Sequence, residues 1–370
     1  MKSRMVSMTF ILLAVAVVSC SNPEKTYTVE TIDGVRYVYN HAPAWGNEPK
    51  VTLELIRKFG EAGSEDDTGY LFNPIDMVRD SRGNVYVLEL TDGQIEKFAP
   101  DGTHIGTIGR KGEGPGEISM AIRMDIDRND NIVVADGGNR RFQTFSPDGK
   151  DLGSRRMQKL RGVFRILSTG DMVSDVMPMQ EEGSRHTLER LDMEGNVKSK
   201  FRPVFDFGGD ETNPSNQDSR FTVTADDCIV SSFKFANCVE KHSPDGTLLF
   251  RADRPLKFDL SYKMTTQTLS DGRTRNRWLR TPVSEQLDID YNGRIWLFSY
   301  KHDMLDMMNN PPEEETSEMY DLHIFDADGV FLGEIDPPFY PAQFRIYGDR
   351  LYLIEFVKEM VVYEYRIIEK

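Results

Sequence analysis

The sequence predicts an all-β fold, a six-bladed β-propeller of four-stranded antiparallel blades whose last blade is completed by an N-terminal strand. A hairpin pattern that ends in Pro-Asp-Gly recurs with one spacing in residues 84–101, 131–148 and 228–245. A short apolar segment precedes each hairpin and an extended segment follows it, which gives four strands per copy. The chain end lacks one strand, and the chain start supplies one. A repeat of four-stranded units is typical of a propeller.

The copy in residues 130–149 shows the pattern most clearly. It contains the apolar run Ile132 to Val134, a Gly-rich reversal at residues 136–139, a second alternating run and the Pro-Asp-Gly turn. This is a β-hairpin with a turn at each end. A lone hairpin is marginally stable because its edges stay unpaired, and repetition around a ring overcomes this.

The repeat register divides the chain into blades. Blade 1 covers residues 74–108 and blade 2 residues 121–152, while blades 3, 4 and 5 start near Val163, Phe221 and Val283. Blade 3 carries an insertion of about six residues between its middle strands and blade 5 one of about 17, counted against the repeat. Blade 6 begins with QFRIYGDRLYLIEF and ends with the chain.

Blade 6 therefore lacks its outermost strand. The segment VTLELIRKFGEAG, which starts at Val51, resembles the outer strand of blade 1, HIGTIGRKGEG. If residues 51–59 form the missing strand, the two ends of the chain close the ring and the count is six. Upstream, YTVETIDGVRYVYN predicts a hairpin turning at Asp33-Gly34 that extends or covers a blade.

The first 20 residues have the pattern of an export signal. Lys2 and Arg4 precede an apolar stretch too short to cross a bilayer, and Val17-Val18-Ser19-Cys20 resembles the lipobox of bacterial lipoproteins. We expect residues 1–20 to be a signal peptide, Cys20 to be lipidated, residues 21–50 to form a tether and hairpin, and residues 51–370 to form the propeller. The alternative is an ordinary signal peptide with a chance cysteine.

Charge and cysteine usage limit the function classes. A net charge of −15 argues against nucleic acid and against a membrane contact beyond the lipid anchor. Besides Cys20 there are two cysteines, Cys228 and Cys238, which excludes a disulfide scaffold and a thiolate zinc site. The two map to neighbouring strands of blade 4, where a disulfide across the hairpin and two buried thiols are both compatible with the spacing.

GNVYVLEL, and NIVVADGGNRRFQTF followed by PDG, are similar to the NHL repeat. With the lipobox, the chain resembles the six-bladed propeller lipoproteins of the Bacteroides group. The resemblance implies the fold and leaves the function open, because propellers include lyases, lactonases, hydrolases and binding platforms. It also implies that the protein is an outer-membrane lipoprotein of the cell envelope, which faces the periplasm or the cell surface.

The strand order predicts which face carries function. The Asp-x-x-Gly and Pro-Asp-Gly turns lie on one face, and their Asp residues are expected to shape tight turns rather than to bind metal. The loops between the second and third strands and between blades lie on the other face, where the large insertions fall. We call this the loop-rich face and expect the ligand there.

Cations that stand out in an acidic chain mark the expected ligand site. An anionic small molecule, a glycan or a protein partner is the predicted ligand, and the alternative is ordinary salt bridging to Asp and Glu. Trp278 offers a stacking surface or a core side chain. The candidate residues are Arg140, Arg161, Arg273, Arg275, Arg277, Trp278 and Arg280, of which the last five lie on a long loop expected beside the channel.

A propeller lyase or hydrolase is the main alternative to a binding protein, and a structural subunit of an envelope complex is a third. NHL-type amidating lyases use a histidine-bound zinc site, but the six histidines here show no matching cluster. The sequence assigns no catalytic residue, metal or cofactor. Convergent His or carboxylate groups at the channel mouth would favour an enzyme, whereas Arg and aromatic side chains would favour binding.

Overall fold

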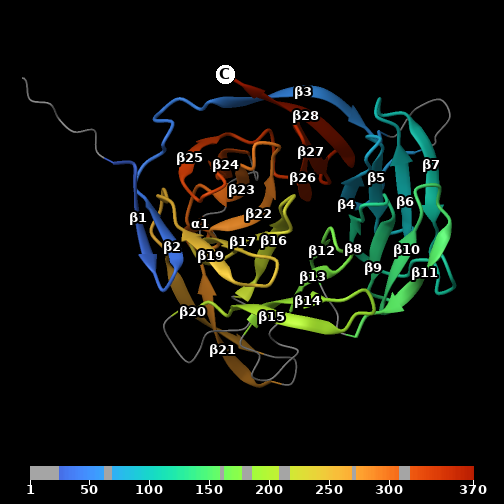
Figure 1. The fold of residues 1–370 in the computed structure, drawn as a ribbon, viewed down its shortest axis with the longest axis horizontal. Helices are drawn as coiled ribbons and strands as arrows, with labels where there is room; N and C mark the ends of the chain where they lie inside the picture. Colours follow the sequence, from blue (N-terminus) through green and yellow to red (C-terminus); the bar gives the residue numbers. More distant parts are fainter. Residues whose placement is uncertain are drawn as a thin grey trace, which may run out of the picture.

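The computed structural model describes residues 25–61, 69–158, 162–176, 186–207, 217–268, 272–307 and 317–370, without the side chains of residues 267, 275–278, 307 and 317. Six sheets, each with four antiparallel propeller strands, surround a central axis (Figure 1). The six-bladed propeller predicted from the repeat is confirmed. In the described part of the chain no helix is long and apolar enough to cross a membrane.

Blades 1 and 2 follow the predicted register. Each runs from an inner strand beside the channel to an outer strand at the rim, in sequence order. Their strands are β4 (Pro74–Arg79), β5 (Val85–Glu89), β6 (Gln94–Phe98), β7 (His104–Gly109), β8 (Ala121–Ile126), β9 (Ile132–Asp136), β10 (Arg141–Phe145) and β11 (Asp151–Arg156).

Blades 3, 4 and 5 have the same order and differ in their connections. Their strands are β12 (Phe164–Ile166), β13 (Met172–Asp175), β14 (His186–Leu191), β15 (Val197–Pro203), β16 (Ser219–Val223), β17 (Ile229–Phe233), β18 (Val239–His242), β19 (Leu248–Ala252), β22 (Ser284–Ile289), β23 (Ile295–Tyr300), β24 (Tyr320–Phe325) and β25 (Phe331–Ile335). A short helix α1 (Met304–Met307) and a 3-10 turn (Ser317–Met319) lie between β23 and β24.

Blade 6 is closed by the start of the chain, as predicted. It consists of β26 (Gln343–Tyr347), β27 (Arg350–Glu355), β28 (Val361–Glu369) and β3 (Val51–Phe59), with β3 outermost. β3 pairs with β28 from Val362↔Phe59 to Glu369↔Val51. β28 is therefore no free edge, and the ring is held shut by backbone hydrogen bonds between its two ends.

The predicted N-terminal hairpin extends blade 4. Its strands β1 (Tyr27–Ile32) and β2 (Val35–Asn40) pair with each other, and β2 lies parallel to the outer strand β19. Asn40 fixes the end of the hairpin, because its Nδ2 donates to the carbonyls of Asp253 and Gly329 and its Oδ1 accepts from the Phe331 N–H.

Apolar side chains fill the spaces between neighbouring blades. One buried cluster joins blades 6, 1 and 2, and a second joins blades 5 and 6 around Trp296 and Phe344. The aspartates of the tight turns are structural, as predicted. Asp80 accepts the backbone N–H groups of Arg82 and Asn84, and Asp127 accepts the equivalent pair in blade 2. Such hydrogen bonds replace the pairing between strands at the point where the chain reverses.

Candidate functional site

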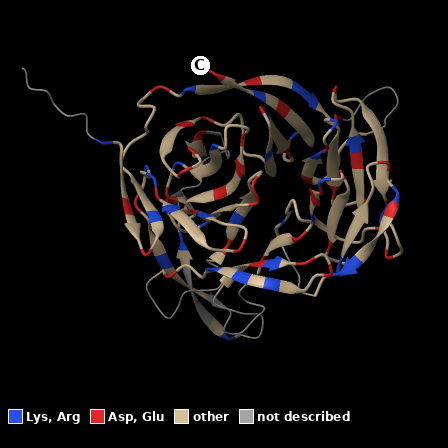
Figure 2. Ribbon diagram, in the orientation of Figure 1, with Lys and Arg blue, Asp and Glu red and all other residues tan. Residues whose placement is uncertain are grey.

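The inner strands place charged side chains in the central channel. Side chains alternate along a strand, so every second residue of an inner strand faces the channel. In β8 these residues are Arg123 and Asp125. Across the blades, those that line the two channel cavities include Arg123, Asp125, Arg165, Arg220, Thr222, Gln286, Asp288, Gln343 and Arg345. Figure 2 shows that charges of both signs occur around the ring.

Two of the channel arginines have no carboxylate partner among the residues that the structure describes. Arg165 is 8% exposed; its Nη1 donates to the Phe164 carbonyl at 2.8 Å, and its Nε has no hydrogen-bond partner. Arg123 donates from Nη1 to the carbonyl of Ile122, at 3.0 Å. Within the described ranges neither guanidinium forms an ion pair, although burial of an unpaired charge costs several kcal/mol.

The other two channel arginines are paired. Arg345 Nη2 lies 2.9 Å from Asp76 Oδ1, and its Nε has no partner among the described residues. Arg220 lies at the loop-rich end of β16, where its Nη1 contacts Asp218 at 2.5 Å. The channel thus contains two arginines with a carboxylate partner and two without one among the described residues.

The channel aspartates are used to join adjacent inner strands. Asp76 Oδ2 accepts the Met124 N–H of the next blade. Asp125 and Asp288 likewise accept the N–H groups of Ile166 and Ile346. These carboxylates hold the ring together, and burial raises the pKa of Asp125.

Burial is the main cause of the pKa shifts of Arg165 and Arg123. It lowers the pKa of Arg165, and Arg345 lowers it further, while Asp125, Asp76 and Asp288 oppose the change. Burial also lowers the pKa of Arg123, which Asp76 opposes and Arg220 reinforces. An anion near these two arginines would offset the free-energy cost of burying their charges.

Two cavities follow the axis. A small one of about 20 Å³ lies among Arg123, Arg165, Arg220, Gln286 and Gln343. These residues belong to the parts of the inner strands nearer the loop-rich face. A larger cavity of about 390 Å³ lies toward the turn face, and Arg165 lines both. The small cavity has room for about one water molecule or one small charged group.

The arginines singled out from the sequence lie elsewhere. Arg140 is exposed at the tip of the blade 2 hairpin, Arg273 is exposed, and Arg161 falls outside the described residues. The long loop folds as a hairpin of β20 (Tyr262–Thr268) and β21 (Thr274–Arg280). Figure 1 shows it at the rim of the ring rather than over the centre.

Among the described side chains of this group, that of Arg280 packs against two aromatic rings. Its guanidinium lies 4.3 Å from the Phe207 ring centre and 5.5 Å from that of Tyr262, and it donates to the Phe207 carbonyl. The side chains of Arg275, Arg277 and Trp278 fall outside the described residues. The expectation that this loop borders the channel is wrong, because the loop pairs with itself as a separate two-stranded sheet. The ligand role of its residues stays a prediction.

The sequence could have indicated the channel arginines. The turn after the inner strand begins at Asp127 in blade 2 and at Thr224 in blade 4. Arg123 and Arg220 each lie four residues before that position. Polar residues at alternate positions of a strand normally face solvent, but in the innermost strand of a ring they face the channel. This rule, applied to every blade, would have selected these side chains.

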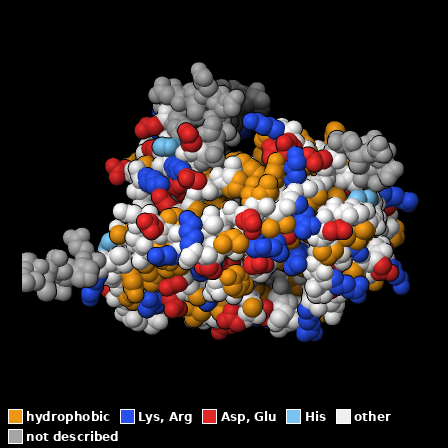
Figure 3. All heavy atoms as spheres, turned by 90° about the horizontal axis from the view of Figure 1, so that it is seen from above, with side chains coloured by type: hydrophobic (Ala, Val, Ile, Leu, Met, Phe, Trp, Pro, Cys, Tyr) orange, Lys and Arg blue, Asp and Glu red, His pale blue; other side chains and the backbone are white. Residues whose placement is uncertain are grey.

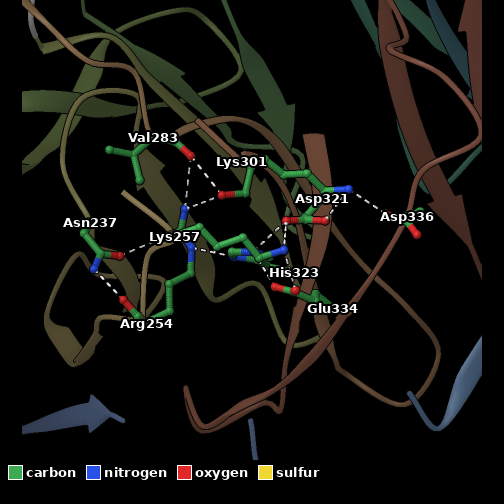
Figure 4. A network of polar contacts seen from close by, with 10 residues as sticks. Asn237, Arg254, Lys257, Val283, Lys301, Asp321, His323, Glu334 and Asp336 are labelled. Atoms are coloured by element: carbon green, nitrogen blue, oxygen red, sulfur yellow. Dashed lines mark hydrogen bonds and ion pairs between the residues drawn. The ribbon is translucent and has the colours of Figure 1, made fainter. Parts of the chain in front are cut away.

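A second polar site lies where the connection from blade 4 meets β24 and β25 of blade 5 (Figure 4). Lys257 Nζ contacts Asp321 Oδ2 at 2.7 Å and Glu334 Oε1 at 2.6 Å. His323 Nε2 lies 3.2 Å from Glu334 Oε2, and Arg254 Nε lies 2.7 Å from His323 Nδ1. These side chains line or support a cleft of about 760 Å³. The sequence reasoning missed this convergence because the residues come from separate strands and loops.

Asp321, His323 and Glu334 are close enough to hold a metal, but their hydrogen bonds oppose it. A guanidinium is only a donor, so Arg254 requires His323 Nδ1 to accept and leaves the proton on Nε2. That proton points to Glu334, whose pKa the hydrogen bond lowers to about 2. No lone pair on Nε2 is left for a metal, and Lys257 already bridges both carboxylates.

Cys228 and Cys238 are both buried and free. Of the two alternatives compatible with the spacing, the structure has the two buried thiols. Ile229 pairs with His242 and Ser232 with Val239, so Cys238 does not lie opposite Cys228. Burial raises the pKa of Cys238 to about 12, which keeps the thiol protonated and unreactive.

Residues 66–243, just under half of the chain, match a family described as a 6-bladed β-propeller. The chain is similar in structure to a DUF4221 family member from Bacteroides vulgatus (12% identity, TM-score 0.60, 87% of this chain and 99% of that chain). It is also similar to a putative exported protein from Bacteroides fragilis (12% identity, TM-score 0.56, 86% and 95%). A third similar structure is a Bacteroides thetaiotaomicron protein of unknown function (11% identity, TM-score 0.51, 86% and 76%). No curated protein sequence matches the chain. At these identities the likeness supports the propeller fold.

Proposed function

We propose that this protein is a non-catalytic binding protein of the cell envelope. Its ligand carries a negative charge and approaches the channel from the loop-rich face. The observation that carries the proposal is the unpaired state of Arg165 and Arg123 beside a small cavity. A guanidinium in a site of low dielectric binds a carboxylate or phosphate more strongly than an exposed one does.

The cavity volume limits what enters. About 20 Å³ accommodates one end of a ligand, such as a carboxylate, while the body of the ligand remains on the loop-rich face. An acidic small molecule, an acidic glycan or a carboxylate of a protein partner meets this requirement. Gln286 and Gln343 line the same cavity and supply neutral polar groups.

The described channel favours binding over hydrolysis. Its three aspartates each accept a backbone N–H from the neighbouring blade. The histidine of the second polar site, His323, lies on β24, the third strand of blade 5, away from the axis. On the side of the ring seen in Figure 3, groups of hydrophobic side chains lie among charged ones.

The envelope location rests on the N-terminal residues. The lipobox-like sequence before Cys20 supports an exported lipoprotein anchored by acyl chains, and a net charge of −15 keeps the propeller itself away from anionic lipid. One structural neighbour is a putative exported protein. We propose that the protein faces the periplasm or the cell surface.

Calorimetry with galacturonate and galactose tests the proposal, because the two sugars differ in one carboxylate. We expect galacturonate to bind and galactose to bind at least about tenfold more weakly, since a charged hydrogen bond contributes about 1.5–3 kcal/mol. Arg165→Gln should weaken galacturonate binding by a similar factor.

The double variant Arg277→Ala with Arg280→Ala tests the competing site, the rim hairpin whose arginines the sequence predicted to bind the ligand. The proposal places the ligand in the channel, so this double variant should bind galacturonate as the wild type does. If Arg165→Gln has no effect and the rim variant loses binding, the channel is not the site. If acetate, sulfate and galacturonate all fail to raise the melting temperature at constant ionic strength, the anion-binding proposal is wrong.

A further inference from the structure

A cleft of about 760 Å³ lies on the side of the propeller where blades 5 and 6 meet. Its walls come from the end of β25, from β3 and β28, and from residues 43–49, which we call the strap. Its size is in the range of small-molecule sites. It is separate from the channel, whose cavities have none of the same lining residues.

The strap is fixed by backbone hydrogen bonds. Ala44 and Trp45 donate their N–H groups to the carbonyls of Phe331 and Leu332, at 2.9 and 2.8 Å, which continue the pairing of β25. Gly333 makes room for the indole, because a Cβ at this position would lie 3.0 Å from Trp45 Cε3. The cleft therefore has a preformed aromatic wall.

The floor of the cleft is charged but balanced. Lys257 bridges Asp321 and Glu334, and Lys301 contacts Asp321 at 3.1 Å and Asp336 at 2.6 Å. Arg254 lies behind them and is 2% exposed. The cluster thus contains three cations and three carboxylates, and Arg254 is joined to it through His323 (Figure 4). A floor without excess charge favours neither an anion nor a cation, in contrast to the channel.

The same floor presents donors and acceptors to solvent. The side chains of Lys257, Glu334 and Asp336 are 47, 33 and 82% exposed. Each has free hydrogen-bonding capacity, since an ammonium has three donors and a carboxylate about four acceptor positions. Trp45 and Tyr365 line the cleft beside them.

We propose that this cleft binds a neutral saccharide. A sugar ring has an apolar C–H face, which suits the Trp45 indole, and hydroxyl groups around its edge, which donate to carboxylates and accept from an ammonium. A charge-balanced floor gains most from a ligand that is polar and uncharged, because no ion has to be left unpaired when it binds.

Three variants and a panel of neutral saccharides test the proposal. The panel contains trisaccharides of glucose, galactose, mannose, xylose and N-acetylglucosamine, with trigalacturonate as the charged comparison, and binding is measured by calorimetry. We expect at least one neutral member to bind. Trp45→Ala and Asp336→Ala should each weaken it by about tenfold or more, while Tyr70→Ala, which removes an exposed aromatic outside the cleft, should not.

Asp336 is largely exposed, so its variant keeps the test valid if Trp45→Ala loosens the strap. Arg165→Gln should leave this binding unchanged, which separates the cleft from the channel. Failure of every neutral saccharide to bind overturns the proposal. So does binding that persists in both cleft variants, or binding of trigalacturonate alone.

Discussion

Arg165 and Arg254 are both buried, but their surroundings differ. Arg254 donates to His323 Nδ1, Asn237 Oδ1, the Val283 carbonyl and Ser299 Oγ. Burial lowers the pKa of Arg254 to about 9, so it stays protonated at neutral pH. Arg165 has one backbone acceptor and an Nε without a partner among the described residues. The first arginine is part of the completed core, whereas the second has donors left for a ligand.

Replacement by Met should therefore act in opposite directions at the two positions. Arg254→Met removes the donor to His323 Nδ1, Asn237 Oδ1 and Ser299 Oγ, while the Val283 carbonyl keeps Ser299 Oγ–H and the Tyr300 N–H as donors. It should lower the free energy of unfolding by about 3 kcal/mol or more. Arg165→Met removes an unpaired buried charge and should leave it unchanged or raise it by about 1 kcal/mol. Urea unfolding in a buffer of low anion content measures both values. An equal loss in the two variants would show that Arg165 is already satisfied.

His242 should make stability depend on pH. Burial lowers its pKa from 6.5 to about 4, and its Nδ1 has no described hydrogen-bond partner. The unfolded chain takes up this proton near pH 6.5 and the folded chain only near pH 4. The free energy of unfolding should therefore fall between these values as pH decreases, by about 1.4 kcal/mol per pH unit.

His242→Leu should remove that contribution, and His302→Leu, at an exposed position, should retain it. Urea unfolding of the three proteins at pH 4.5, 5.5 and 6.5 gives the slopes. A His242→Leu slope equal to the wild-type slope would show that His242 titrates alike in both states.

At the scale of elements, the repeat predicted the strands and turns whose register is determined within a single blade. Blades 1 and 2 follow it because the alternating strands and the Asp-Gly turns determine their register within each copy. Insertions carry no such pattern. Residues 262–280 form a hairpin at the rim because Tyr262 to Thr268 pair with Thr274 to Arg280, and charge alone did not indicate this. The spacing of Cys228 and Cys238 left a disulfide and two thiols open, because spacing alone does not determine where the hairpin between β17 and β18 turns.

The residues that line the side cleft could not be predicted from local sequence pattern either. Trp45, Lys257 and Glu334 are far apart in sequence and meet only because the strap crosses β25. In contrast, the channel arginines follow from blade geometry once the inner strands are known. Repeat periodicity thus predicts sites near the axis better than sites formed by connections.

At the scale of the whole molecule, the ring depends on β3. This strand supplies the outer edge of blade 6, and its pairing with β28 runs along nearly all of both strands. Deletion of residues 21–60 should expose β28, remove the apolar contacts of Val51 and Phe59, and lower the melting temperature by more than 10 °C or cause aggregation, as expected for a loss of several kcal/mol. Circular dichroism of the truncated protein, produced without a leader, checks this. A soluble truncation with the wild-type melting temperature would contradict closure by β3.

The central claim is that the channel holds an anion at its unpaired arginines. Anomalous diffraction from crystals soaked in bromide tests it most directly, because bromide is a small anion with its own scattering signal. We predict a peak in the small cavity within hydrogen-bond distance of Arg165 and close to Arg123, absent in Arg165→Gln. An empty cavity, with the Arg165 guanidinium bonded to a carboxylate of the protein itself, would contradict the account.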